Sequence, residues 1–202
     1  MTKIPLTDLY AATDEQAARN VKAAQQNAPW LRDLNAEVRV ITSLQISPKG
    51  RFIRMRKLAD RIASAVTPHA ACGSGCSHCC HVAVVIPERE ANLIGSAIGR
   101  RPEKVRGISP AEEDVLVREK FATPCPFLKK GRCSIYAERP IACRVHFNMA
   151  DSPYFCDTGI QPEVSRVPNL DLRIFWAGYT LLMMDSPWAD IRDFFPPKPG
   201  AR

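Results

Sequence analysis

The sequence of 202 residues has no long hydrophobic segment. Its most apolar stretch, around residues 174–184, is interrupted by Gly178 and is shorter than the roughly 18 residues that a helix needs to span a bilayer. The first residues lack the apolar core and the small-residue cleavage site of a signal peptide. We therefore expect a cytoplasmic protein with no membrane segment.

Motifs of two common enzyme classes are also missing. No glycine-rich loop follows a predicted strand, which argues against a nucleotide-binding fold. No Gly-x-Ser-x-Gly sequence is present, so serine hydrolysis has no support. Because no acid–base pair stands out either, the sequence assigns no catalytic residue and leaves open whether the protein is an enzyme.

Cysteine, in contrast, is abundant, with eight residues in two separated segments. A reducing cytoplasm disfavours disulfides, and a bridge between the adjacent Cys79 and Cys80 would be strained. We therefore interpret the cysteines as ligands of a metal. The first segment holds Cys72, Cys76, Cys79 and Cys80, and the second holds Cys125, Cys133, Cys143 and Cys156.

Thiolates are soft ligands that suit zinc, iron–sulfur clusters and cuprous ion. Cys76 and Cys79 have the two-residue spacing that lets both sulfurs reach one metal, whereas the side chains of adjacent Cys79 and Cys80 diverge. Two arrangements stay open. One has two four-coordinate sites, and the other has one four-cysteine iron–sulfur cluster of the 4Fe-4S type with the remaining thiols free. In the first arrangement His78, His81 or His146 substitutes for a cysteine that is out of reach.

The net charge of +7 is concentrated in one predicted helix over residues 48–66. We expect Arg54, Lys57 and Arg61 on one face of this helix. No aromatic residues interleave with the basic ones, as they would on a surface that stacks nucleic-acid bases. The basic face is therefore either solvated or a contact for nucleic acid or protein. The apolar side is predicted to comprise Ile53, Leu58, Ile62, Ala65 and Val66.

The patterns predict a mainly α fold with small β elements (α+β), in which a helical bundle surrounds a cysteine-ligated metal site with a short hairpin. Residues 1–70 form an N-terminal helical extension, 71–160 the cysteine-cluster domain, and 161–202 the C-terminal closing helices and a tail that frays at 196–199. The hairpin is expected over residues 125–136, with its turn at Lys130-Gly131. Helices are expected at about 13–26, 31–43, 48–66, 87–98, 110–121, 137–145 and 168–184, and a strand at 81–86.

These residues together resemble the YkgJ-type cysteine-cluster family, which is named for a CxxCxxCC signature and described as chelating zinc or iron. The resemblance covers about residues 72–147. The first spacing departs from the signature, with three residues between Cys72 and Cys76 instead of two. The motifs that carry it are Cys72-x3-Cys76-x2-Cys79-Cys80, Val84-Val85-Ile86-Pro87, Cys125-Pro-Phe-Leu, Gly131-Arg-Cys133-Ser-Ile-Tyr136, Arg139-Pro140 and Cys143-Arg144.

The resemblance implies a ligand set and a supporting shell. Arg139 and Arg144 match charged positions of the family and are expected either to hydrogen-bond thiolate sulfur or to form ordinary surface salt bridges. Cys156 lies beyond the core pattern and is expected to be a bystander. The implied metal ligands are Cys72, Cys76, Cys79, Cys80, Cys125, Cys133 and Cys143.

Three classes of function fit this ligand set. The first is a protein that chelates zinc or an iron–sulfur cluster, as a carrier or as a structural site. A similar cysteine arrangement occurs in lysine N-methylases that modify flagellin, which gives a redox or protein-modifying enzyme as the second class. The third is a zinc-stabilised module that contacts nucleic acid or protein through the basic helix.

Overall fold

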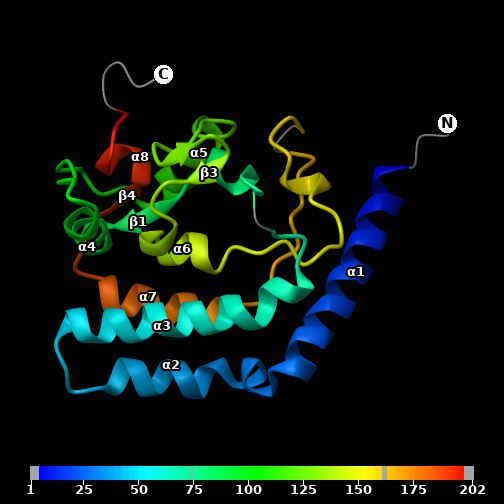
Figure 1. The fold of residues 1–202 in the computed structure, drawn as a ribbon, viewed down its shortest axis with the longest axis horizontal. Helices are drawn as coiled ribbons and strands as arrows, with labels where there is room; N and C mark the ends of the chain where they lie inside the picture. The colour runs from blue at the N-terminus through cyan, green and yellow to red at the C-terminus, as the bar shows by residue number, and fades with distance from the viewer. Residues whose placement is uncertain (1–4, 74, 161–162, 198–202) are drawn as a thin grey trace. The chain divides into compact units, whose positions relative to one another are not determined.

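Figure 1 shows the computed structural model of the chain, which describes residues 5–73, 75–160 and 163–197. The described residues form eight α-helices, several 3-10 turns and four short strands in two small antiparallel sheets. This confirms the predicted mainly α fold with small β elements. Within these residues no helix has both the length and the apolar character needed to cross a membrane.

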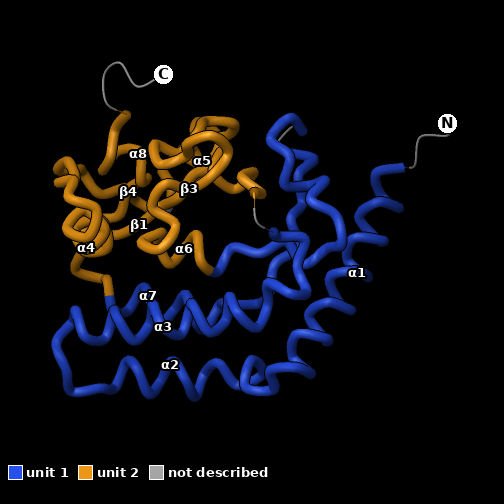
Figure 2. Tube along the Cα trace, in the orientation of Figure 1, with its two compact units in different colours: residues 1–74, 145–182 blue, residues 75–144, 183–202 orange. Residues whose placement is uncertain are grey.

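The chain divides into two compact units, each assembled from two separate stretches (Figure 2). Unit 1 comprises residues 1–74 and 145–182, and unit 2 comprises residues 75–144 and 183–202. The three predicted regions follow the chain in order, whereas both units combine segments that are distant in sequence. Cys72 and Cys156 therefore belong to unit 1, and the other cysteines belong to unit 2.

Unit 1 is helical. Helix α3 (Pro48–Val66) begins with local signals: Ser47 caps it by accepting a hydrogen bond from the Gly50 N–H, and Pro48 occupies the first turn. The predicted bounds of this helix are confirmed at both ends. The elements are α1 (Leu6–Asn27), η1 (Pro29–Asp33), α2 (Leu34–Ser43), α3 (Pro48–Val66), η2 (Thr67–His69), η5 (Tyr154–Cys156) and α7 (Arg173–Met183).

The buried face of α3 agrees with the predicted one only in part: Phe52, Met55 and Ala59 are buried although they were not predicted, and Ala65 is only half-buried. Leu58, Ile62 and Val66 are buried as expected, but Ile53 is 42% exposed. The buried side begins with Phe52 and continues at intervals of three or four residues, so position 53 is turned about 100° away from it. The prediction for Ile53 was therefore wrong, because Phe52 takes the place in the core.

Helix α7 packs closely against its neighbours in unit 1. A Cβ atom added at Gly178 would lie 2.3 Å from Cγ1 of Val38 on α2, so only glycine fits there. The predicted start of this helix near residue 168 was wrong, because it begins at Arg173. Leu170 and Leu172 are buried in the extended segment before it, where alternate side chains face the same side.

Unit 2 is built around a strand pair that joins distant parts of the chain. Strand β1 (Val85–Pro87) pairs antiparallel with β4 (Trp188–Asp190), with Ile86 opposite Ala189. The predicted strand at 81–86 is shorter and later than expected, because His81 ends a 3-10 turn and Pro87 is still extended. The other elements are η3 (His78–His81), α4 (Glu88–Ile98), α5 (Pro110–Glu119), β2 (Leu128–Lys129), β3 (Arg132–Cys133), η4 (Tyr136–Glu138), α6 (Ile141–Arg144) and α8 (Ile191–Phe194).

The predicted hairpin is confirmed in β2 and β3, where Leu128 lies opposite Cys133. Lys130 and Gly131 form the two-residue turn and have φ angles of 49° and 71°. Positive φ at both positions is what a type I′ hairpin turn requires.

The core of unit 2 lies between the β1–β4 pair, α4 and α8, and its members include Ile86, Ile94 and Phe194. The thiols of Cys125 and Cys143 pack against this core. Of the predicted tail at 196–199, Lys198 and Pro199 lie outside the described residues.

Candidate metal centre

Cysteines from both sequence segments meet in unit 2. The 3-10 turn η3 carries Cys79 and Cys80, and the backbone N–H of Cys125 donates to the carbonyl of Cys80 at 2.7 Å. Five thiols of unit 2 lie close enough together for a charge on one to change the pKa of another. We call this group the five-thiol cluster. Its members are Cys79, Cys80, Cys125, Cys133 and Cys143.

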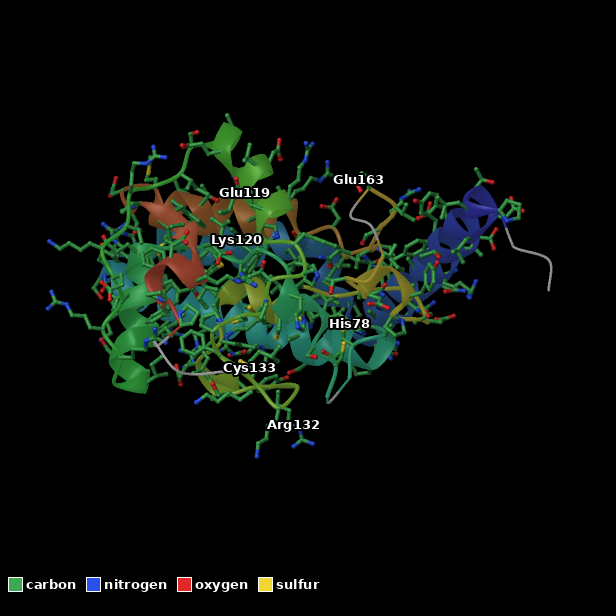
Figure 3. All side chains as sticks on the ribbon, turned by 90° about the horizontal axis from the view of Figure 1, so that it is seen from above. His78, Glu119, Lys120, Arg132, Cys133 and Glu163 are labelled. Carbon is green, nitrogen blue, oxygen red and sulfur yellow. The ribbon has the colours of Figure 1, made fainter. Side chains whose placement is uncertain are left out.

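The hairpin and α6 position the second half of the cluster. Cys133 ends β3, and Figure 3 shows the neighbouring Arg132 side chain pointing away from the ribbon. Cys143 lies on α6, whose first N–H, from Ile141, donates to the buried Glu90 carboxylate at 2.8 Å. Helix α4 thereby fixes the start of the helix that carries Cys143.

The adjacent Cys79 and Cys80 titrate as a pair. A hydrogen bond from the Cys80 thiol, helped by the Cys79 amide and the charge of Arg139, lowers the pKa of Cys79 to about 7 against the opposing effect of burial. The same hydrogen bond and burial raise the pKa of Cys80. The pair therefore loses its first proton near neutral pH, from Cys79, while Cys80 keeps its proton.

The remaining buried thiols hold their protons more tightly. Burial raises the pKa of Cys143 well above its ordinary value, and the neighbouring thiols and Glu90 add to the effect. Burial also raises the pKa of Cys125, while a hydrogen bond from the Phe127 N–H and the charge of Arg192 oppose it. A thiophilic cation would displace these protons, because cysteine binds metals as the thiolate.

Arg139 lies beside the cluster with one unused donor. Its guanidinium lies 3.7 Å from the centre of the Tyr136 ring, and its Nε–H is buried and has no hydrogen-bond partner. Buried N–H groups without an acceptor are rare. Its charge also stabilises the Cys79 thiolate, so a negatively charged sulfur group would suit this donor.

The second predicted arginine supports the backbone. The Nε–H of Arg144 donates to the Arg139 carbonyl at 2.9 Å, and its Nη2–H donates to the Ala137 carbonyl. Arg144 is buried, so these bonds hold the loop that leads to Cys143.

The three predicted histidines lie in different surroundings. His78 is half-buried on η3 next to Cys79. His81 ends the same turn, and its Nδ1 lies 3.1 Å from the Ser77 carbonyl oxygen. His146 belongs to unit 1 and is exposed. A role for any of them beside a metal stays a prediction.

Cys72 and Cys156 form a separate sulfur pair in unit 1. The buried Asn148 donates its backbone N–H to Cys72 Sγ at 3.4 Å and its side-chain amide to Cys156 Sγ at 3.2 Å. The Asn148 amide also donates to the Ser152 carbonyl at 2.9 Å, which fixes its orientation. No sequence pattern predicts this pairing, because Asn148 belongs to no metal-binding motif.

Cys76, the remaining predicted ligand, is exposed in unit 2. Over the described residues 5–73, 75–160 and 163–197, no three His, Cys, Asp or Glu side chains have positions suited to hold a metal ion together. The thiols of the cluster are therefore neighbours, but as placed they do not form a metal-binding geometry.

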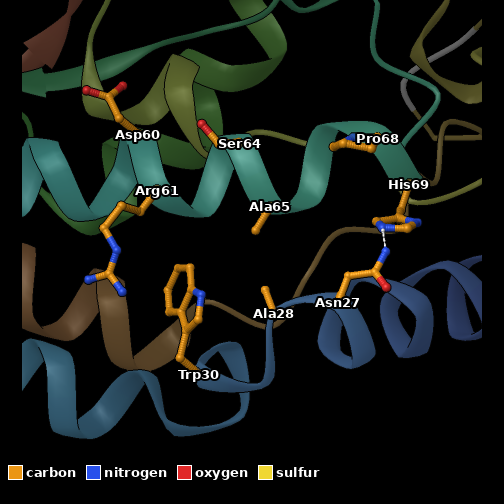
Figure 4. Close-up of a pocket in the computed structure, with 9 residues that line it drawn as sticks. All are labelled: Asn27, Ala28, Trp30, Asp60, Arg61, Ser64, Ala65, Pro68 and His69. Carbon is orange, nitrogen blue, oxygen red and sulfur yellow. Dashed lines mark hydrogen bonds between the residues drawn. The ribbon is translucent and has the colours of Figure 1, made fainter.

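A groove of about 600 Å³ lies in unit 1 beside the predicted basic helix and contains no cysteine (Figure 4). Trp30 and Arg61 line one part of it, with the guanidinium 4.4 Å from the ring centre. Arg61 also forms two hydrogen bonds with Glu37, at 3.0 and 3.3 Å. Part of the predicted basic face is thus already engaged, and a contact with nucleic acid or protein there stays a prediction.

Comparison with known proteins identifies the region that carries these cysteines. No curated protein and no solved structure matches the chain. Residues 71–159 match a family model described as "CxxCxxCC: Putative zinc- or iron-chelating domain". All eight cysteines fall within the matched residues. Residues 71–159 are therefore similar to this domain family, as their motifs indicated.

Proposed function

We propose that the five-thiol cluster chelates a thiophilic metal, as zinc or as an iron–sulfur cluster, through four thiolates. The observation that supports this proposal most strongly is that cysteines from η3, the hairpin and α6 lie together at a partly buried place in unit 2. Zinc and iron–sulfur clusters both take four cysteine sulfurs in proteins.

The surroundings suit a negatively charged sulfur centre. The buried Nε–H of Arg139 has no acceptor of its own, and it would donate to a ligated sulfur. Two carboxylates lie close enough to act on the cluster thiols, and both are already engaged: Glu90 accepts from the Ile141 N–H, and Asp190 accepts from Arg192. This disfavours magnesium or calcium, which prefer oxygen ligands.

Binding of such a metal by the thiolates would release protons from the thiols. Cys143 and Cys125 are protonated in the protein alone, so metal binding must remove protons from them. Metal affinity is then expected to rise with pH. The four bonds would join η3, the hairpin and α6.

The test is elemental analysis, acid-labile sulfide and a visible absorption spectrum on the full chain purified without oxygen. Zinc in a colourless protein identifies a zinc site, and iron with equimolar sulfide identifies a cluster. Cys133→Ser and Cys143→Ser should each lower the bound metal. Cys156→Ser, which removes a sulfur of unit 1, should retain it. Full metal content in both Cys133→Ser and Cys143→Ser would refute the proposal.

A further inference from the structure

A buried ion pair lies in unit 2 outside the residues that match the family. Asp190 ends β4 and Arg192 lies in α8, both beyond residue 159. The Nη1 of Arg192 lies 3.0 and 3.1 Å from the two carboxylate oxygens of Asp190. Asp190 is 0% exposed and Arg192 6% exposed, so solvent does not screen the pair.

The rest of the Arg192 guanidinium binds backbone next to the cluster. Its Nη2 donates to the carbonyls of Val82 at 3.1 Å and Cys80 at 3.4 Å. The same nitrogen donates to the Thr123 carbonyl, and Nε donates to the Pro124 carbonyl at 3.3 Å. One side chain therefore holds the backbone of η3 and the residues immediately before Cys125.

Asp190 fixes both the arginine and the strand after Cys80. Besides the ion pair, its carboxylate accepts from the Val84 N–H and from the Arg192 N–H, each at 2.8 Å. The partners of the Asp190 carboxylate are thus Arg192 and the N–H of Val84, which follows η3 in the chain. A buried charge pair is seldom the most stable way to fill a core, so stability alone is a weak reason for it.

We propose that Asp190 and Arg192 are positioning residues for the five-thiol cluster. Arg192 sets the separation of the two cysteine segments by holding carbonyls of both, and Asp190 orients Arg192. Neither side chain binds sulfur, so their effect on a metal acts through the backbone of Cys80 and Cys125. A measurement of metal affinity tests this proposal only if the proposed function is right, whereas hydrogen exchange of the Cys125 amide tests it independently.

The first variant is Arg192→Lys, which keeps the charge but replaces the branched donor group. In the full chain we expect metal affinity to fall by about 10-fold or more, as is usual for residues that support metal ligands. We also expect faster hydrogen exchange of the Cys125 amide, whose acceptor is the Cys80 carbonyl. Competition with a chromogenic chelator measures the first quantity, and NMR measures the second.

Ile94→Ala is the matched control. Ile94 is 4% exposed in the same core, and its truncation removes apolar contacts in unit 2. If metal affinity falls and the Cys125 exchange rate rises equally in both variants for an equal loss of stability, the pair is only structural and the proposal is wrong. A selective effect of Arg192→Lys supports it.

A double variant, Asp190→Leu with Arg192→Met, guards against simple unfolding. Apolar residues of similar size often replace a buried ion pair without loss of stability. The proposal expects a chain with the circular dichroism of the wild type and rapid exchange at Cys125. Unchanged exchange in a folded double variant would overturn it. If the wild type binds no zinc and no iron, the proposed function fails, and Cys125 exchange in the metal-free protein still decides this inference.

Discussion

The backbone N–H of Cys125 donates a hydrogen bond to the backbone carbonyl of Cys80 across 2.7 Å. The two residues are separated in sequence by β1, α4 and α5, so this bond joins the two cysteine segments directly. A single hydrogen bond contributes only about 0.5–1.5 kcal/mol net. The backbone therefore brings the thiols together, and further bonds are needed to keep them there.

Removal of the proposed metal should loosen unit 2 selectively. Metal ligation contributes to folding free energy, and the ligands would come from η3, the hairpin and α6. After treatment with a chelator, we expect faster hydrogen exchange in β2, β3 and α6, with little change in α2 and α3. Chelator already saturated with zinc serves as the control. Equal loss of protection in both units would contradict this expectation.

Gly178→Ala should destabilise unit 1. The added Cβ would lie 2.3 Å from Val38 Cγ1, and overpacking of this kind costs about 1–3 kcal/mol. Adding Val38→Ala removes the clashing methyl group, so the double variant should lose less than the sum of the two single losses. Thermal unfolding of the four proteins measures the coupling.

Gly73→Ala is the control for the effect of replacing a glycine by alanine without a clash, because a Cβ at that position meets no atom within 4 Å. Additive losses in the double variant would show that the contact between α2 and α7 is looser than the structure indicates.

The elements that the sequence predicted well are those with local causes. Ser47 and Pro48 begin α3, and Gly131 readily adopts the positive φ that the second position of the Lys130-Gly131 turn requires. The strand pair β1–β4 was not predicted, because β4 has three residues and its partner lies far away in sequence. Three residues carry too little periodicity to indicate a strand.

The candidate site was likewise predicted in part. The residue types and spacing predicted a soft-metal site, and the structure places Cys79, Cys80, Cys125, Cys133 and Cys143 near one another. The exact ligand set stays a prediction. Arg192 and Asn148 were missed, because a side chain that binds distant carbonyls or sulfurs leaves no local pattern.

Acid should remove the contribution of Glu112 to helix α5. Hydrogen bonds from the Ser109 backbone and the Arg106 guanidinium lower the pKa of Glu112 from its ordinary 4.5 to about 2. Because the folded pKa is depressed, the contribution is present above pH 4.5 and is lost as the pH falls toward 2. Glu112→Gln should therefore melt below the wild type at neutral pH, and the difference should close near pH 2.

Glu113→Gln is the matched control, since it removes the next charge on the helix but leaves the Ser109–Glu112 capping box intact. The two variants should differ at neutral pH and converge in acid. A gap that persists at pH 2 would show that the carboxylate charge is not the cause.

Asn148→Ala should expose Cys156 more than Cys72. The variant removes the amide that donates to Cys156 Sγ and to the Ser152 carbonyl, as well as the oxygen that accepts from the Ala150 N–H at 3.0 Å. The Cys72 sulfur keeps its bond, because that donor is the backbone N–H of residue 148. Loss of buried hydrogen bonds of this kind costs about 1–3 kcal/mol.

Alkylation with iodoacetamide followed by mass spectrometry measures the rate at each thiol. Asn20→Ala is the matched control, because Asn20 donates to the Met149 carbonyl at 2.9 Å and to Asp151 at 2.7 Å without touching either sulfur. We expect Cys156 to react faster in Asn148→Ala than in Asn20→Ala, with Cys72 changed equally by both. Equal rates at Cys156 in the two variants would show that the segment is held by its α1 contacts and that the amide of Asn148 does not protect the sulfur.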